Sequence, residues 1–295
     1  MNTARELAYA KVNLFLDIVA RREDGFHDVS TVMHPISLHD ELIIKIKPSK
    51  TRSIKMYVQG AVRVPVDSRN LAYRAVELYM SYLGVYGAVE IQLEKNIPVA
   101  AGLAGGSADA AAALRAMNRL YKKALSQRIL LNLAETLGSD VPFCLLMQTA
   151  MCQGRGEVMT PVVVNRTLHF VIAIANEYVS TPKAYEALDK LYSDFDGSVP
   201  FGKGDIVPSL LNFLYYPTAN YQLTLYNIFE DAVLPICEGA KKIREALGAL
   251  SPMGVLMSGS GPSVYAIFEN EFQAKEAVEQ INKMGYHAYY ATSKE

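Results

Sequence analysis

Residues 97–107 read I-P-V-A-A-G-L-A-G-G-S, a run of small, uncharged residues that contains three glycines. The run follows a predicted strand, Val89–Leu93, and precedes apolar residues at helical spacing from Ala110 to Tyr121. Glycines let a backbone approach a ligand closely, and a helix N-terminus offers unpaired N–H groups and the positive end of a dipole. The stretch therefore favours an anion cradle that needs no lysine, although a plain connector has the same composition.

Three familiar phosphate-binding signatures do not match this loop. No lysine follows the last glycine, so the loop is not a G-x-x-x-x-G-K-[ST] loop. Its spacing is not G-x-G-x-x-G, and the chain contains neither H-R-D nor D-F-G.

A second cluster, S-G-S-G-P-S at 258–263, lies between two predicted strands. It is either a hairpin turn or a second nest of N–H and hydroxyl donors.

Composition excludes several classes of protein. The 295 residues include 29 Lys+Arg and 30 Asp+Glu, a formal net charge of −1, so a bulk nucleic-acid binder is not expected. The three cysteines and five histidines show no zinc spacing. No signal-peptide pattern and no apolar run of about 18 residues is present, so we expect a cytoplasmic protein with no membrane partner.

Periodicity predicts the order of elements in the N-terminal half. Ala8–Val19 alternates as a strand does, which places Lys11, Asn13 and Asp17 on its second face. Leu71–Leu83 reads as a helix that begins after Asn70 and stops at Gly84. Further segments are predicted as strands at 27–36 and 41–47, a helix at 126–137, and the start of another helix at Asp140-Val141-Pro142.

The C-terminal half reads as a split βαβ layer, so the fold class is α+β. The weak boundary at 159–161 divides the chain into domains 1–160 and 161–295. The predicted elements of the second domain are strands at 168–175, 253–258, 264–268 and 286–291 and helical stretches around 183–191, 228–250 and 271–284.

Five polar or aromatic positions each have an ordinary explanation. Asp140 suits a helix N-cap with Pro142 in the first turn. Lys11 suits a solvated strand residue. Phe26-His27 could be a core ring beside a surface imidazole, and Tyr185 could be a core ring of a helix. Each signal is weak by itself, and their joint occurrence in this order is informative.

Four motifs together resemble the 4-diphosphocytidyl-2-C-methyl-D-erythritol kinase family. The loop at 98–109 and the M-S-G-S-G-P motif at 257–262 alone indicate only the wider GHMP kinase superfamily. This superfamily includes galactokinase, homoserine, mevalonate and phosphomevalonate kinases. The residues that carry the resemblance are A-Y-A-K-V-N-L-F-L at 8–16 with D-G-F-H at 24–27, Pro98–Asp109, L-G-S-D-V-P-F at 137–143, and M-S-G-S-G-P at 257–262.

The resemblance implies a two-domain GHMP kinase fold, with a ribosomal-protein-S5-domain-2-like N-terminal domain and a ferredoxin-like C-terminal domain. It implies transfer of the γ-phosphate of ATP, with Mg²⁺, to the 2-hydroxyl of 4-diphosphocytidyl-2-C-methyl-D-erythritol in the non-mevalonate isoprenoid route. The partner would be this small molecule, and the chain would act as a monomer or weak homodimer. The metal ligands are not indicated.

The resemblance also assigns site residues. Asp140 is the catalytic carboxylate and Lys11 its neighbour. Phe26 and Tyr185 would sandwich the cytosine, with His27 hydrogen-bonded to it. The remaining assignments are ATP binding by Asn70, Lys95, Pro98, Val99, Ala100, Ala101, Gly102, Leu103, Ala104, Gly105, Gly106, Ser107 and Ala108, and substrate binding by Asn13, Gly259 and Ser260.

The departures from the family pattern are small. Phe26 stands where Tyr is frequent, and Ala100 and Ala104 replace glycines of some relatives, which should narrow the flexibility of the loop. Residues 193–208 match nothing. Two rival functions stay open: another small-molecule kinase of the superfamily, and a non-catalytic nucleotide- or RNA-binding module.

Overall fold

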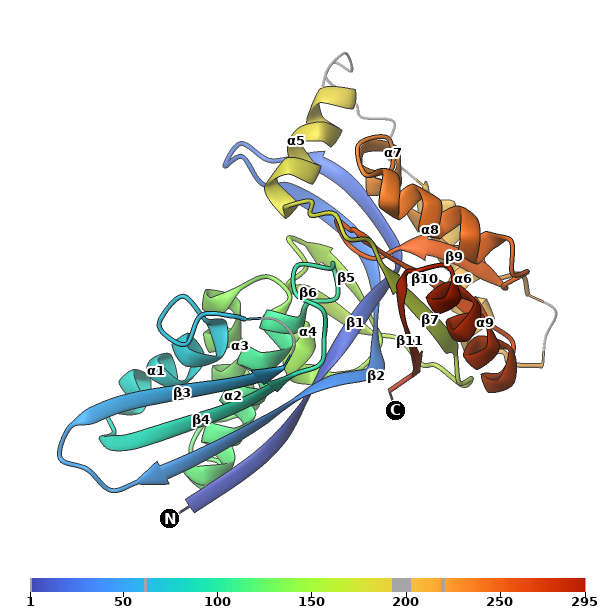
Figure 1. The fold of residues 1–295 in the computed structure, drawn as a ribbon. Coiled ribbons are helices and arrows are strands. Elements are labelled where there is room, and N and C mark those ends of the chain that lie inside the picture. The colour runs from blue at the N-terminus through green and yellow to red at the C-terminus, as the bar shows by residue number, and fades with distance from the viewer. Residues whose placement is uncertain (1, 61–62, 193–202, 219–220, 295) are drawn as a thin grey trace. The chain divides into compact units, whose positions relative to one another are not determined.

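The computed structural model describes residues 2–60, 63–192, 203–218 and 221–294 (Figure 1). It divides into two compact units, and each unit is discontinuous in sequence. The first unit comprises residues 1–10, 38–99 and 104–147, and the second comprises residues 11–37, 100–103 and 148–295. The proposed boundary at residue 160 stays a prediction. None of the described helices is both long and apolar enough to span a membrane.

The first unit is a layer of strands covered on one side by helices α1 to α4 (Figure 1). The strands β2 and β4 are antiparallel, whereas β3 and β4 are parallel. The elements that contribute to this unit are β1 Asn2–Arg21, β2 His27–Lys47, β3 Arg52–Gly60, α1 Leu71–Leu83, β4 Gly87–Lys95, α2 Gly105–Leu120, α3 Gln127–Leu137 and α4 Val141–Leu146.

Helix α1 begins and ends where the sequence predicts. Asn70 is its N-cap, and the Oδ1 atom of Asn70 accepts a hydrogen bond from the amide of Ala72 at 2.9 Å. Gly84 ends the helix in the left-handed conformation. The neighbouring helix α2 is buried along most of its length because its alanines at 110–113 let other helices approach closely.

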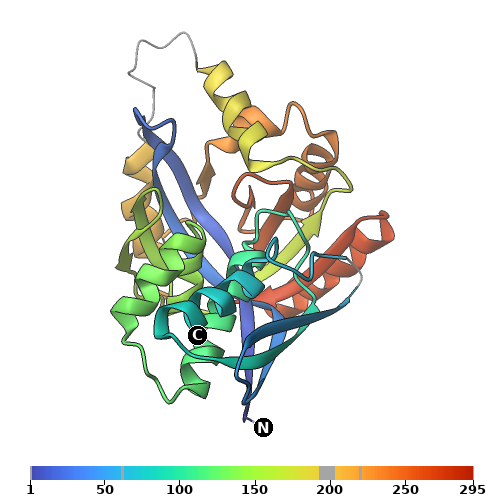
Figure 2. The same ribbon diagram turned by 90° about the vertical axis from the view of Figure 1, so that its left-hand side faces the viewer.

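The second unit contains the rest of β1 and β2 and the C-terminal half of the chain. The blue strands β1 and β2 run side by side in both ribbon views (Figures 1 and 2). In this unit β5 pairs with β2, and β8 pairs with β1. The further elements are β5 Ala150–Gly154, β6 Val158–Pro161, β7 His169–Ile174, α5 Thr181–Leu191, the 3₁₀ turn Lys203–Asp205, α6 Ile206–Tyr215, β8 Tyr226–Asn227, α7 Phe229–Val233, α8 Glu238–Gly248, β9 Gly254–Met257, β10 Ser263–Phe268, α9 Glu271–Lys283 and β11 His287–Thr292.

A four-stranded antiparallel sheet in the second unit has the order β11-β7-β10-β9. Helices α8 and α9 pack against it, and all six residues of the central strand β10 are buried. The first and third strands in sequence therefore lie in the middle, as in a ferredoxin-like split βαβ layer. The predicted fold class is confirmed.

Two details of the predicted elements are wrong. The helical stretch around 228–250 is divided between α7 and α8, with Pro235 in the interruption. Proline lacks an N–H group, so Pro235 cannot donate the next hydrogen bond of the helix, and α7 ends before it. The two strands predicted at 27–36 and 41–47 are one continuous strand, β2. Part of the unmatched segment, 193–202, lies outside the described residues, and the rest begins helix α6.

The buried Tyr265 hydroxyl ties the sheet of the second unit to β1. It donates a hydrogen bond of 2.8 Å to the carbonyl oxygen of Asn13. We expect Tyr265→Phe to lower the free energy of unfolding by about 1–2 kcal/mol, because a buried carbonyl loses its partner. Urea denaturation measures this change. Tyr82→Phe, at a ring that is 54% exposed, is the control, and equal effects of both substitutions would contradict the assignment.

Candidate active site

Strand β1 carries a buried chain of polar side chains in the second unit. The Nζ atom of Lys11 donates to Oδ1 of Asn13 at 2.8 Å, and Nδ2 of Asn13 donates to Oγ1 of Thr31 at 2.8 Å. The Thr31 hydroxyl donates in turn to the carbonyl of Phe15 at 2.6 Å. Lys11 is only 4% exposed, so it is not a solvated strand lysine. Because an ammonium can only donate, this chain fixes which side of the Asn13 amide faces Lys11.

The tip of the glycine-rich loop packs against the S-G-S-G-P-S turn of the same unit. The Ser258 hydroxyl donates to the carbonyl of Gly102 at 3.0 Å, and the Ser263 hydroxyl donates to the carbonyl of Ala101. A Cβ atom on Gly102 would overlap the Ser258 carbonyl, and φ of Gly102 is +74°. Glycine is required here by both space and conformation. The turn therefore does more than join two strands.

Lys11 lies at this junction of the two glycine clusters. Its amide donates to the carbonyl of Leu103 at 3.2 Å. A Cβ atom built on Gly259 would lie 3.5 Å from Nζ of Lys11 and 3.2 Å from the carbonyl oxygen of Gly102. Three segments that are far apart in sequence thus meet at Lys11 in the second unit. The Ser260 hydroxyl lies 2.9 Å from that of Thr181, at the start of α5.

The loop keeps left-handed conformations at two alanines. Ala100 and Ala104 both have φ of +55°, a region that residues with a Cβ atom adopt rarely. Such strain persists only where the surrounding contacts hold the backbone in place, and it is common at functional sites. The contacts around the loop therefore hold these two alanines in the left-handed region.

The first turn of α2 presents backbone donors in the first unit. Its N-cap is Ala104, which has no side-chain capping hydrogen bond. The first helical bond in this region runs from the amide of Ala108 to the carbonyl of Ala104 at 2.9 Å. Amides before Ala108 have no carbonyl partner within the helix. This helix N-terminus suits an anionic group such as a phosphate.

A buried ionic cluster fixes the strand that leads into the loop. The Nζ atom of Lys95 donates to Oδ2 of Asp40 and, at 2.9 Å, to Oδ2 of Asp109 in helix α2. The other oxygen of Asp40 accepts the amides of Asn96 at 2.6 Å and Ile97 at 2.8 Å. The cluster therefore anchors both the start of the loop and the helix that follows it. We predict Lys95 to contact ATP, and the structure gives its ammonium this second task.

The surroundings in this cluster raise the pKa values of both Asp109 and Lys95, for different reasons. Burial raises the pKa of Asp109 well above its usual range, and this effect outweighs the attraction of Lys95. Burial opposes the charge of Lys95, yet Asp109 and Asp40 together raise its pKa. The second oxygen of Asp109 is buried without a hydrogen-bond partner in the part of the chain that is described. Two carboxylates beside one ammonium favour a proton on the less well paired one, Asp109.

Asp140 occupies the N-cap position of α4, with Pro142 in the first turn, as the sequence predicts. Its side chain makes no capping hydrogen bond, and its own backbone is already helical, with φ −86° and ψ −10°. A capping aspartate normally has an extended backbone and accepts an amide of the first turn. Helix capping therefore does not account for this carboxylate.

The residues assigned to the cytosine lie in the second unit. The rings of Tyr185 and His27 are stacked, with centroids 4.8 Å apart and an interplanar angle of 27°. Phe26 is 57% exposed, and the guanidinium of Arg155 lies 5.5 Å from its ring. An exposed ring suits stacking with a ligand. The proposed sandwich between Phe26 and Tyr185 stays a prediction.

Asn70 has a structural task in the first unit. In addition to capping α1, its Nδ2 atom donates to the carbonyl of Pro65 at 2.9 Å. Sequence reasoning missed Thr31 and Asp40 of these networks, and it missed Asp189, whose Oδ1 atom lies 2.8 Å from Nε2 of His27. Asp189 lies four residues after Tyr185 in a predicted helix, and this spacing was the one signal that could have found it.

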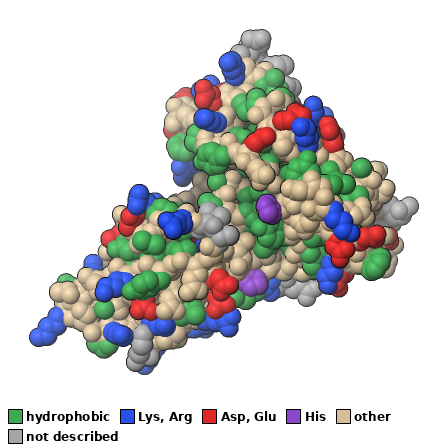
Figure 3. All heavy atoms as spheres, viewed as in Figure 1, with side chains coloured by type: hydrophobic (Ala, Val, Ile, Leu, Met, Phe, Trp, Pro, Cys, Tyr) green, Lys and Arg blue, Asp and Glu red, His purple; other side chains and the backbone are tan. Residues whose placement is uncertain are grey.

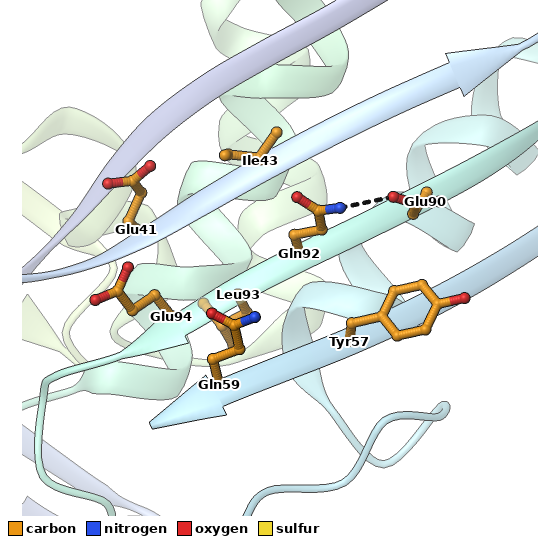
Figure 4. A pocket seen from close by; sticks show the side chains of 8 residues that line it. All are labelled: Glu41, Ile43, Tyr57, Gln59, Glu90, Gln92, Leu93 and Glu94. Atoms are coloured by element: carbon orange, nitrogen blue, oxygen red, sulfur yellow. Dashed lines mark hydrogen bonds between the residues drawn. The ribbon is translucent and has the colours of Figure 1, made fainter. Parts of the chain in front are cut away.

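A separate hollow lies on the exposed sheet face of the first unit (Figure 4) and has a volume of about 390 Å³. Three carboxylates at its lining would repel phosphate, and one of them, Glu90, accepts a hydrogen bond from Gln92 at 2.7 Å. None of the predicted site residues belongs to its lining, which comprises Glu41, Ile43, Tyr57, Gln59, Glu90, Gln92, Leu93 and Glu94.

Acidic and basic side chains both occur on the face of the molecule seen in Figure 3. This face therefore carries both charge signs, in keeping with the net charge of −1. A phosphate group would therefore have to be bound by nearby N–H donors, of the kind that the loop and the first turn of α2 provide.

Comparison with known proteins identifies the class. The family description "GHMP kinases N terminal domain" matches residues 70–148, and "GHMP kinases C terminal" matches residues 218–287. The crystal structure of L. major mevalonate kinase in complex with R-mevalonate has the same fold, with a TM-score of 0.76 at 17% identity over 99% of this chain and 96% of that one. The chain has the fold of the GHMP kinases.

Two closer relatives narrow the assignment. The 4-diphosphocytidyl-2-C-methyl-D-erythritol kinase of Caldicellulosiruptor saccharolyticus is 37% identical over 279 residues, which cover 93% of this chain and 91% of the relative. A crystal structure of 4-(cytidine 5'-diphospho)-2C-methyl-D-erythritol kinase has a TM-score of 0.82 at 35% identity and covers 99% of this chain and 100% of that one. The chain belongs to the 4-diphosphocytidyl-2-C-methyl-D-erythritol kinase family.

The raised pKa of Asp109 predicts a pH dependence of stability. The folded state holds this proton more tightly than the unfolded chain, whose carboxyl titrates near pH 4. As the pH rises above about 4, the unfolded state binds fewer protons than the folded state, so the free energy of unfolding falls. Asp109→Asn removes this contribution. Between about pH 5 and 8 we expect the free energy of unfolding of the variant to fall less steeply with rising pH than that of the parent.

Urea denaturation at several pH values measures this difference. Asp67→Asn is the control, because hydrogen bonds from Arg69 lower the pKa of Asp67 to about 2 and its titration therefore lies below this range. Parallel pH profiles for the parent and the Asp109 variant would show that Asp109 is ionised throughout.

Proposed function

We propose that this chain carries out the reaction of its family. It transfers the γ-phosphate of ATP to the 2-hydroxyl of 4-diphosphocytidyl-2-C-methyl-D-erythritol and releases the 2-phosphate and ADP, in the non-mevalonate isoprenoid precursor pathway. The observation that carries the proposal is the 37% identity to a kinase of this name over 91% of its length. The polar networks described above supply groups that this chemistry needs.

Asp140 and Lys11 act on the reacting groups in this proposal. Phosphoryl transfer depends on positioning and on stabilisation of charge. Asp140, whose carboxylate is not used for capping, orients the substrate hydroxyl and accepts its proton. The buried ammonium of Lys11 attracts the negative charge that develops during transfer, and its low exposure strengthens that attraction.

Backbone amides bind the phosphates of ATP, the donor used by GHMP kinases. The loop from Pro98 to Ala108 contributes its N–H groups, and the first turn of α2 contributes its dipole. Among the described residues no group of three or more His, Cys, Asp or Glu could hold a metal ion. Mg²⁺ needs few protein ligands when phosphates and waters fill its other coordination positions. The residues of this site therefore fit an Mg²⁺ ion that arrives bound to ATP.

The cytidine end of the substrate supplies binding energy remote from the reaction. Phe26 and Tyr185 stack on the cytosine, and His27 hydrogen-bonds it. Asn13, Gly259 and Ser260 hold the methylerythritol and diphosphate parts. Binding at a distance then orients the reacting hydroxyl, because transfer requires it in line with the phosphate.

A coupled assay of ADP release over a panel of alcohols tests the proposed substrate. We expect turnover of the cytidyl substrate and none of comparable efficiency with mevalonate or homoserine, which have no base to stack. Turnover of mevalonate or homoserine without turnover of the cytidyl substrate would instead favour another GHMP kinase activity. Filter binding with RNA at physiological salt addresses the non-catalytic alternative, which predicts RNA retention without ATP turnover.

The role of Asp140 is tested by Asp140→Asn. We expect turnover to fall by about 10²-fold or more, the usual effect of losing an acid–base group, while ATP binding is retained. Steady-state kinetics and ATP titration measure the two quantities. Near-normal turnover would show that Asp140 has only a structural role.

A further inference from the structure

Helix α5 holds the imidazole of His27 through two residues on one face. Tyr185 and Asp189 are four positions apart and therefore adjacent on the helix surface. The Tyr185 ring stacks on the imidazole, and Oδ1 of Asp189 lies 2.8 Å from its Nε2 atom. The stack fixes the plane of the imidazole, and the hydrogen bond fixes its rotation within that plane.

The carboxylate of Asp189 has a second partner. Nη2 of Arg21 lies 3.7 Å from Oδ2 of Asp189, so each carboxylate oxygen faces a different residue. The His27 side chain is 7% exposed, whereas that of Arg21 is 66% exposed. The contact between His27 and Asp189 is thus the more sheltered of the two, and it gains more from reduced screening by water.

This arrangement determines the tautomer of His27. An ionised carboxylate only accepts hydrogen bonds, so Nε2 of His27 must carry the proton that Asp189 accepts. In the neutral imidazole the other nitrogen, Nδ1, then carries a lone pair. Among the described residues none forms a hydrogen bond with Nδ1. His27 therefore presents an acceptor.

We propose that Asp189 is a positioning residue that makes His27 select a base with an exocyclic amino group. Nδ1 accepts a hydrogen bond from the N4 amino group of cytosine, whereas uracil would place its O4 acceptor against the same lone pair. A site built for one hydrogen-bonding group rejects an analogue that cannot form the bond. The inference rests on the proposed function, in which His27 binds the base.

Kinetic discrimination between two substrates tests the proposal. The full chain is assayed with the cytidyl substrate and with its uridyl analogue, and the two values of kcat/KM are compared. Asp189→Asn keeps the size of the side chain but offers a donor as well as an acceptor, so the imidazole can adopt either tautomer. We expect the preference for the cytidyl substrate to fall by about 10-fold, mainly through a higher KM for that substrate, as loss of one hydrogen bond implies.

Glu186→Gln is the matched control. It removes one carboxylate from the same helix at the residue after Tyr185, outside the contact with His27. We expect its ratio of kcat/KM values to equal that of the parent. An unchanged ratio in Asp189→Asn, or an equal loss with both substrates, would overturn the proposal, because a merely structural role affects both substrates alike.

A second measurement separates this inference from the proposed function. Two-bond ¹⁵N–¹H couplings in NMR spectra report the tautomer of His27 in the free protein at about pH 8, where imidazoles are ordinarily neutral. We expect the Nε2–H form in the parent and in Glu186→Gln, and a mixture in Asp189→Asn. The Nδ1–H form in the parent would overturn the inference even if the cytidyl substrate is turned over. Failure of turnover with the Nε2–H form present would count against the proposed function alone.

Discussion

The glycine-rich loop depends on hydrogen bonds that involve two buried lysines and their neighbours and hold its backbone within each compact unit. In the first unit Lys95 joins Asp40, which receives the amides that open the loop, to Asp109 in the helix that follows. In the second unit the tip of the loop is fixed by the backbone amide of Lys11 and by the hydroxyls of Ser258 and Ser263. Removing charge from water is costly, and these ammoniums are tolerated because acceptors surround them. A chain that buries two charged lysines beside this loop bears an energetic cost, and a functional need for a fixed loop shape would explain that cost.

This arrangement explains how a chain with a net charge of −1 can handle phosphates. The two buried lysines each have specific partners, and the loop and the start of α2 offer backbone amides as donors. Backbone donors on a fixed loop need no reorganisation when charge develops, whereas a flexible surface lysine must be ordered first. Left-handed alanines at 100 and 104 are the local strain that accompanies this rigidity.

Much of the fold follows from local sequence patterns. The alternation in β1, the caps of α1 and the split βαβ order were predictable because each depends on residues within a few positions of one another. Contacts between distant residues were not predictable in this way. The pairing of Asp40 with Lys95 joins positions 55 residues apart, and that of His27 with Asp189 joins positions 162 apart.

The candidate site shows the same division. Its motif residues were named from sequence, but their surroundings were not: Lys11 is buried rather than solvated, and the Asp140 side chain does not cap α4. A single sequence does not reveal burial of a charged residue when the partners lie on other strands. The family resemblance supplied the roles, which stay predictions, and the structure supplied hydrogen bonds around several of these side chains.

The central claim is that backbone amides of the loop, rather than a basic surface, receive the phosphates of ATP. Amide chemical-shift mapping during titration with Mg²⁺–ATP tests it most directly. We predict the largest ¹H–¹⁵N shifts at Ala101–Ala108. The claim would be contradicted if the signals of these amides stayed unchanged and the shifts appeared instead at the hollow around Glu41, Glu90 and Glu94.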